Sequence, residues 1–133
     1  MPTAIFSHPD SGGPRITLSQ AEKRWISANP IVRVAPDPSY KPIEALDSAG
    51  QLTGMSADYL TLLEQTTGLR FEVTKPRNWD DAMRMVRENE AEILTAATKT
   101  DARETYLTFA PPHIDLPGVI ITRRGGTEYE TLE

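Results

Sequence analysis

Few side chains in this sequence are suited to catalysis or to metal binding. The chain has no cysteine, which excludes disulfides, thiolate metal sites and a cysteine nucleophile. Its two histidines, His8 and His113, stand far apart, and neither has the neighbours of a histidine metal site. The acidic pair Asp80 and Asp81 follows Asn78, where carboxylates stabilise a helix start, so we interpret both as helix-start charges. With no serine elbow and no phosphate-binding glycine loop, the residues predict neither an enzyme nor a metal or cofactor site.

The side chains suited to binding a small molecule gather in three short segments. These are PDPSY at 36–40, the turn from Pro76 to Trp79, and TKTDAR at 98–103. Asp37 is suited either to a local turn or to a ligand contact, and Tyr40 either to packing or to stacking on a ligand. We interpret Trp79 first as a core anchor and keep it as a ligand-binding candidate.

The elements that must position these segments alternate between strands and helices. Ser56, Asn78 and Thr100 are each predicted to cap a helix, and Gly68 to end one. The apolar run EILTAA at 92–97 is typical of a buried parallel strand. Strands or extended pieces are predicted at 31–35, 43–46, 51–53, 69–73, 92–97, 107–110 and 118–122.

This order predicts an α/β fold with a mainly parallel sheet flanked by helices. In such sheets ligands bind outside the carboxyl ends of the strands, which is where the three segments would meet. Residues 1–16, rich in proline, glycine and serine, are predicted to be a flexible lead-in. Within the lead-in region 17–30, the capping box in LSQAE predicts a short helix that ends at Asn29 and Pro30.

Length, composition and charge exclude several classes of protein. A chain of 133 residues, with 38% hydrophobic and 25% charged residues, is the size of one globular domain. A net charge of -5 without a basic stripe argues against nucleic-acid binding. No apolar run reaches the roughly 18 residues of a membrane span, and the first residues lack the features of a signal peptide. We therefore expect a chain that neither spans a membrane nor directs its own export.

One long stretch resembles a known family. The residues IVRVAPDPSYKPIEALDSAGQLTGMSADYLTLLEQTTGLRFEV, then NW, then EILTAATKTDARETYLTFAPP resemble the first lobe of family 3 extracellular solute-binding proteins. The lead-in LSQAEKRWISANPIVRV is similar to Venus-flytrap domains in the periplasmic part of bacterial hybrid sensor histidine kinases. The resemblance implies a type II periplasmic-binding-protein-like lobe at residues 17–124. It also implies that 125–133 begin a hinge or C-terminal tail, with the second lobe incomplete.

The resemblance also implies which residues bind a ligand. Asp37 and Tyr40 match an aspartate and an aromatic residue that touch the ligand from the first loop. Thr98 and Arg103, with Thr95 nearby, match the group that holds the ligand's carboxylate. A planar guanidinium suits this role because it donates two parallel hydrogen bonds to a carboxylate.

The function implied by the resemblance is ligand sensing. It would be that of a periplasmic domain of a sensor histidine kinase in two-component signal transduction, within an exported or membrane-anchored parent protein. A small carboxylate or an amino acid would bind between this lobe and the second lobe. A transport solute-binding protein and a cyclohexadienyl-dehydratase-like enzyme on the same fold remain alternatives. A homodimer is also left open, whereas no nucleic-acid partner is expected.

Overall fold

The computed structural model describes residues 16–126, and its contacts divide the chain into two compact units, residues 1–98 and 99–133. The prediction of a flexible lead-in falls almost wholly on residues outside the described part, as does most of the predicted hinge or tail. The first unit contains α1 (Gln20–Ala28), β1 (Ile31–Val34), β2 (Ser39–Tyr40), β3 (Glu44–Leu46), β4 (Leu52–Thr53), α2 (Met55–Thr67), β5 (Arg70–Val73) and α3 (Trp79–Arg87). The second contains α4 (Asp101–Glu104).

The predicted capping box starts α1. The Glu22 amide donates to the Ser19 hydroxyl at 3.2 Å, and the Glu22 carboxylate accepts from the Ser19 amide at 2.6 Å. The helix ends at Ala28, directly before Asn29 and Pro30, as predicted. None of its residues is buried, and the Trp25 side chain is 54% exposed. The helix therefore rests on its own hydrogen bonds more than on packing.

The parallel strands form the centre of the first unit. β1 pairs with β5 in parallel, with Val32 opposite Phe71 and Val34 opposite Val73. On its other edge β1 meets the chain at Ile93, where Val34 and Ile93 form a parallel bridge. The Ala35 amide donates to the Ile93 carbonyl at 2.9 Å. The strand predicted at 92–97 is thus reduced to this one bridge, and the spatial order is β5, β1, then the Ile93 segment.

A small antiparallel sheet separates β1 from α2 in the sequence. Its strands are ordered β2, β3, β4. The turn between β3 and β4 is made by Asp47, whose Oδ1 atom accepts hydrogen bonds from the amides of Ala49 and Gln51 at 2.9 and 2.8 Å. This confirms the hairpin expected from the residues DSAG.

The start of α2 differs from the prediction that Ser56 caps it. Gly54 is the N-cap residue, at a φ of 93°. The amides of Met55 and Ser56 donate to the carbonyls of Pro42 and Ile43, so backbone groups of the preceding sheet take the place of a side-chain cap. A β-carbon at position 54 would lie 2.7 Å from both carbonyl oxygens, which only glycine avoids. Ser56 is buried, and its hydroxyl has no partner among the described residues.

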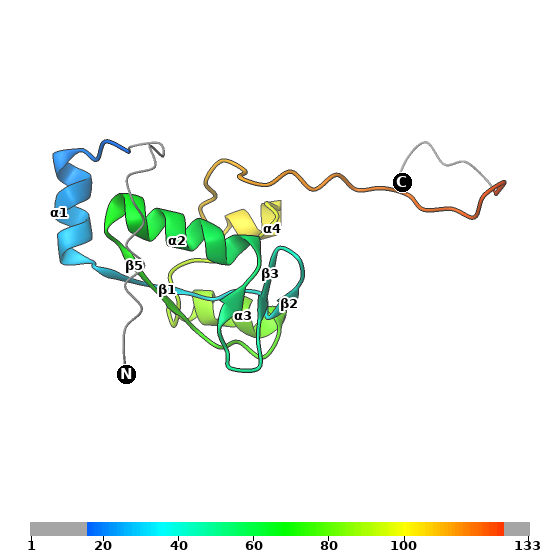
Figure 1. Cartoon of the computed structure of the whole chain (residues 1–133), viewed down its shortest axis with the longest axis horizontal. Helices are drawn as coiled ribbons and strands as arrows, with labels where there is room; N and C mark the ends of the chain where they lie inside the picture. Colours follow the sequence, from blue (N-terminus) through cyan, green and yellow to red (C-terminus); the bar gives the residue numbers. More distant parts are fainter. Residues whose placement is uncertain (1–15, 127–133) are drawn as a thin grey trace, which may run out of the picture. The chain divides into compact units, whose positions relative to one another are not determined.

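The helices α2 and α3 lie on opposite sides of the β1–β5 pair (Figure 1). The crossover through α2 leads from β1 to β5, and the crossover through α3 leads from β5 to the Ile93 segment on the other edge of β1. Because both crossovers are right-handed and they run in opposite directions along the sheet, their helices lie on opposite faces. Asn78 caps α3 as predicted, accepting from the Asp81 amide at 2.9 Å. Ala82 on α3 packs against Ala35 and Ala91 in a core that Trp79 and Leu94 partly cover. The α/β fold with a parallel sheet between helices is confirmed.

The second unit contains one short helix and no strand among its described residues. Thr100 caps α4 as predicted, its hydroxyl accepting from the Arg103 amide at 3.3 Å. The segments 107–110 and 118–122, predicted as extended pieces, are not paired into a sheet within the described part. Ile121 is 90% exposed there. In residues 16–126, every helix is too short or too polar to cross a lipid bilayer.

Candidate binding site at the carboxyl edge of the parallel strands

The order of the parallel strands indicates where a ligand binds in sheets of this kind. The chain leaves β1 toward β5 on one side, and the crossover after β5 returns to the Ile93 segment on the other side. At such a reversal the loops after two adjacent strands turn away from each other and leave a crevice at the strand ends. The two exits beside the reversal are Ala35–Asp37, after β1, and Leu94–Thr98, after Ile93.

The structure brings two predicted residues, Asp37 and Thr95, to a common partner in the first unit. The Asp37 amide donates to Oε1 of Glu44 at 2.7 Å, and the Thr95 hydroxyl donates to Oε2 of the same carboxylate. Glu44 is fully buried. Sequence analysis missed this residue, although a charged side chain between Ile43 and Ala45 in a predicted strand was the signal that could have found it.

The first loop is shaped by a local turn at Asp37. Its Oδ1 atom accepts from the Ser39 amide at 2.9 Å and lies 3.4 Å from the Ser39 hydroxyl. This is the turn that sequence analysis weighed against a ligand contact, and it leaves the second carboxylate oxygen, Oδ2, for other donors. Tyr40 ends β2 and is 42% exposed, so its ring offers an accessible aromatic surface close to this turn in sequence.

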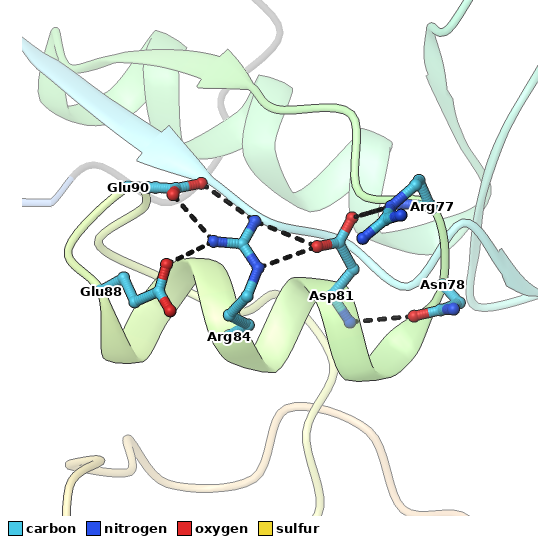
Figure 2. A network of polar contacts seen from close by, with 6 residues as sticks. All are labelled: Arg77, Asn78, Asp81, Arg84, Glu88 and Glu90. Atoms are coloured by element: carbon cyan, nitrogen blue, oxygen red, sulfur yellow. Dashed lines mark hydrogen bonds and ion pairs between the residues drawn. The ribbon is translucent and has the colours of Figure 1, made fainter.

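The turn from Pro76 to Trp79 is held by a network of charges at the start of α3 (Figure 2). Oδ2 of Asp81 accepts from the amide and from Nε of Arg77, at 3.0 and 3.1 Å. On the other side, Oδ1 of Asp81 accepts from Nε of Arg84 at 3.0 Å. Arg84 in turn contacts Glu88 at 2.5 Å and Glu90 at 2.8 Å, beyond the end of the helix. The network therefore fixes the turns at both ends of α3.

These contacts shift the ionisation of both central groups. The Arg77 side chain, then the Arg77 amide and Arg84, hold the pKa of Asp81 well below its usual range. The carboxylates of Glu90 and Glu88, followed by Asp81, raise the pKa of Arg84. Because every charge in the network has an opposite neighbour, its members stabilise one another and are poorly suited to proton transfer. We interpret it as structural support for the turn that carries Trp79.

The other predicted residues are placed as follows. Trp79 is half-buried and packs against the core, which agrees with its interpretation as an anchor. Thr98 is exposed at the end of the first unit. Arg103 is half-buried and belongs to the second unit, where its amide is held by Thr100. In residues 16–126, no three His, Cys, Asp or Glu side chains are grouped so as to hold a metal ion.

Residues 32–129 match the family of bacterial extracellular solute-binding proteins, family 3. The chain is 31% identical over 119 residues to the virulence sensor protein BvgS of Bordetella pertussis, covering 90% of this chain and 9% of BvgS. It is 26% identical over 118 residues to the sensor protein EvgS of Escherichia coli O157:H7, covering 89% of this chain and 10% of EvgS. It is also 28% identical over 102 residues to a probable histidine-binding protein of Neisseria gonorrhoeae, covering 74% of this chain and 38% of that protein.

Solved structures agree with the sequence comparison. The periplasmic domain of B. pertussis BvgS is similar with a TM-score of 0.68 at 31% identity, over 74% of this chain and 19% of that one. The VFT2 domain of the same protein is similar with a TM-score of 0.67, over 74% of this chain and 42% of that one. The chain thus spans about a tenth of the length of the sensor proteins and less than half of the VFT2 domain. By the match over most of its length and by its parallel strand order, the chain belongs to the family 3 bacterial extracellular solute-binding proteins.

Proposed function

We propose that this chain is the first lobe of a periplasmic ligand-sensing domain, part of a sensor histidine kinase in two-component signal transduction. The observation that carries the proposal is the carboxyl-edge site, where Asp37 and Thr95 flank the strand reversal in a chain of this family. Support for sensing over transport comes from BvgS and EvgS, sensor proteins that match about nine-tenths of this chain, α1 included.

The proposed ligand is an amino acid or another small carboxylate. Arg103 would hold the carboxylate through its guanidinium, with Thr98 as a further donor, because charge-assisted pairs of this kind are the stronger hydrogen bonds. Asp37 would contact the rest of the ligand through its Oδ2 atom, and Tyr40 would contact it through its aromatic ring. Trp79 would support the site by anchoring its turn to the core.

The proposed mechanism is closure of two lobes on the ligand. A ligand that touches both lobes binds the closed state more tightly than the open state, and so it shifts the population toward closure. The second lobe would supply the other wall of the site. The lone lobe would therefore bind weakly, since a pocket with one wall buries little of its ligand.

Titration of the 133-residue chain with amino acids and carboxylates, followed by heteronuclear NMR, tests the proposal. We expect millimolar binding, with shifts at Asp37, Thr98 and Arg103. Arg103→Gln should remove these shifts, whereas Arg87→Gln, which removes an exposed arginine from α3, should leave them unchanged. If no compound shifts these residues, alone or in a chain extended by the second lobe, the site does not bind small carboxylates.

A second candidate is a transport solute-binding protein, favoured by the similarity to the probable histidine-binding protein of N. gonorrhoeae. The two candidates differ in what the parent protein does after binding. A parent with a kinase domain whose phosphorylation level responds to the ligand identifies the sensor. A parent that is a free binding protein, and that restores uptake of the ligand in cells lacking their own, identifies the transporter component.

A further inference from the structure

Glu44 is a carboxylate in the interior of the first unit. It is 0% exposed and lies in β3 between Ile43 and Ala45, which are 4% and 2% exposed. A carboxylate removed from water is costly unless hydrogen bonds satisfy it. A hydrophobic residue would fill the same place at no such cost, so the partners of Glu44 indicate what the residue does.

Each oxygen of Glu44 is bonded to one residue of the candidate site. Oε1 accepts from the Asp37 amide at 2.7 Å, and Oε2 is bonded to the Thr95 hydroxyl. Asp37 follows β1, and Thr95 follows the Ile93 segment on the adjacent edge. One buried side chain thus joins the two chain exits that flank the strand reversal.

The direction of the second hydrogen bond follows from the chemistry of the groups. A carboxylate only accepts hydrogen bonds, so the single proton of the Thr95 hydroxyl is committed to Glu44. The oxygen of that hydroxyl then has only lone pairs to offer to a third group. While Glu44 is in place, Thr95 can accept from a ligand but cannot donate to it.

We propose that Glu44 is a positioning residue for the binding site, and that it makes Thr95 an acceptor for an N–H group, the ammonium group of an amino acid. This inference rests on the proposed function. It adds that the ligand carries an ammonium group beside Thr95, and that Glu44 sets this preference without contacting the ligand. The carboxylate of the ligand is held elsewhere, since Thr95 has no proton to donate to it.

The substitution Glu44→Gln tests the direction of the bond at constant size. The glutamine oxygen can still accept from the Asp37 amide, whereas its NH2 group now donates to the Thr95 oxygen. The Thr95 proton is then released and can be donated to a ligand. The variant therefore keeps both contacts and changes the Thr95 hydroxyl from a hydrogen-bond acceptor to a donor toward the ligand.

Glu64→Gln is the matched control. Glu64 also holds a backbone amide, that of Phe71 in β5, through Oε1 at 2.7 Å. Glu64 lies near the end of α2, and its contact is at the beginning of β5. The candidate site is at the other, carboxyl end of the parallel strands. Because glutamine can still accept from that amide, this variant tests the general effect of replacing a glutamate that accepts from the backbone.

The probes are L-arginine, L-glutamine, L-histidine and L-glutamate, each compared with the acid that lacks the α-ammonium group. NMR titration of the full 133-residue chain should show that the amino acid binds more tightly than its partner acid. Glu44→Gln should reduce this preference about tenfold, the effect of one hydrogen bond to a charged group. Thr95→Val should reduce it equally, alone or combined with Glu44→Gln, and Glu64→Gln should not change it. A preference that survives Glu44→Gln overturns the inference.

Hydrogen exchange of the Asp37 amide tests the positioning role of Glu44 without any ligand. Its hydrogen-exchange rate should stay within about threefold in Glu44→Gln and rise about tenfold or more in Glu44→Leu, because leucine accepts no hydrogen bond. An Asp37 amide that exchanges equally slowly in both variants overturns the positioning role, whatever the probes do. If the exchange rates are as expected and no probe binds the wild type, the proposed function fails together with the ammonium preference. Only the joining of the two exits by Glu44 then stands.

Discussion

Two helix caps with the same chemistry should have very different effects on stability. Ser19 and Asn78 each accept a hydrogen bond from the amide three residues on, at 3.2 and 2.9 Å. Replacing such a cap by alanine costs about 1 kcal/mol of helix stability. In α3 this loss should appear in global unfolding, because Ala82 on that helix is fully buried in the core. In α1 it should not, because that helix buries no residue and can fray while the rest stays folded.

Urea unfolding and thermal unfolding, each followed by circular dichroism and by tryptophan fluorescence, measure the difference. Asn78→Ala should lower the free energy of unfolding by about 1 kcal/mol and the Tm by roughly 4–8 °C, as expected for a unit of this size. Ser19→Ala should change neither quantity measurably, while hydrogen exchange of the α1 amides accelerates. Asn78→Gly is the control, since glycine costs only a few tenths of a kcal/mol at a cap. Equal losses of global stability in Ser19→Ala and Asn78→Ala would show that α1 is integrated into the core and refute the reasoning.

Three further outcomes are expected. In urea unfolding, Gly54→Ala should destabilise the chain by several kcal/mol more than Gly68→Ala. Both positions have a positive φ, so both variants share a cost of about 1–2 kcal/mol. Only at position 54 does the new methyl group lie 2.7 Å from two carbonyl oxygens. Asp81→Asn should flatten the pH dependence of stability in acid. The folded pKa of Asp81 is lowered, so its contribution is complete above the unfolded pKa of about 3.9 and is lost as the pH falls toward the folded value. Unfolding midpoints at pH 5, 4 and 3 should therefore fall more steeply in the wild type than in Asp81→Asn, and parallel curves would contradict this. Leu60→Ala should lower the free energy of unfolding by about 2–5 kcal/mol, measured in the same way, because Leu60 on α2 is only 7% exposed. A loss below about 1 kcal/mol would mean that the surrounding residues collapse around the smaller side chain.

Most elements could be predicted because their signals are local. The caps Ser19, Asn78 and Thr100 and the terminating Gly68 act within one turn of the helix they bound, so the sequence around each of them is sufficient. The alternation around Phe71 likewise marks β5, and its parallel pairing follows from the intervening helix. The fold class followed from the order of these elements.

The wrong or missing predictions depended on distant residues. Ser56 has the right chemistry for a cap, but the carbonyls of Pro42 and Ile43 accept from the first amides of α2 instead. The sequence around Ser56 does not indicate that these distant carbonyls lie close to it. Glu44 was missed for the same reason, because its carboxylate meets the hydroxyl of Thr95, which lies 51 residues later in the sequence. The roles of Arg103 and Thr98 remain predictions from family resemblance, since Arg103 lies in the second unit.

The pairing of β1 also has a consequence for how the chain folds. Its Val34 carbonyl accepts from both the amide and the hydroxyl of Thr74, 40 residues later, and Arg33 meets Glu92 59 residues later. The two edges of β1 therefore stay unpaired until β5 and the Ile93 segment reach them. Contacts this distant slow folding and prolong the exposure of apolar strand edges to other chains. We expect the unfolded chain to depend on chaperones until the Ile93 segment has paired with β1.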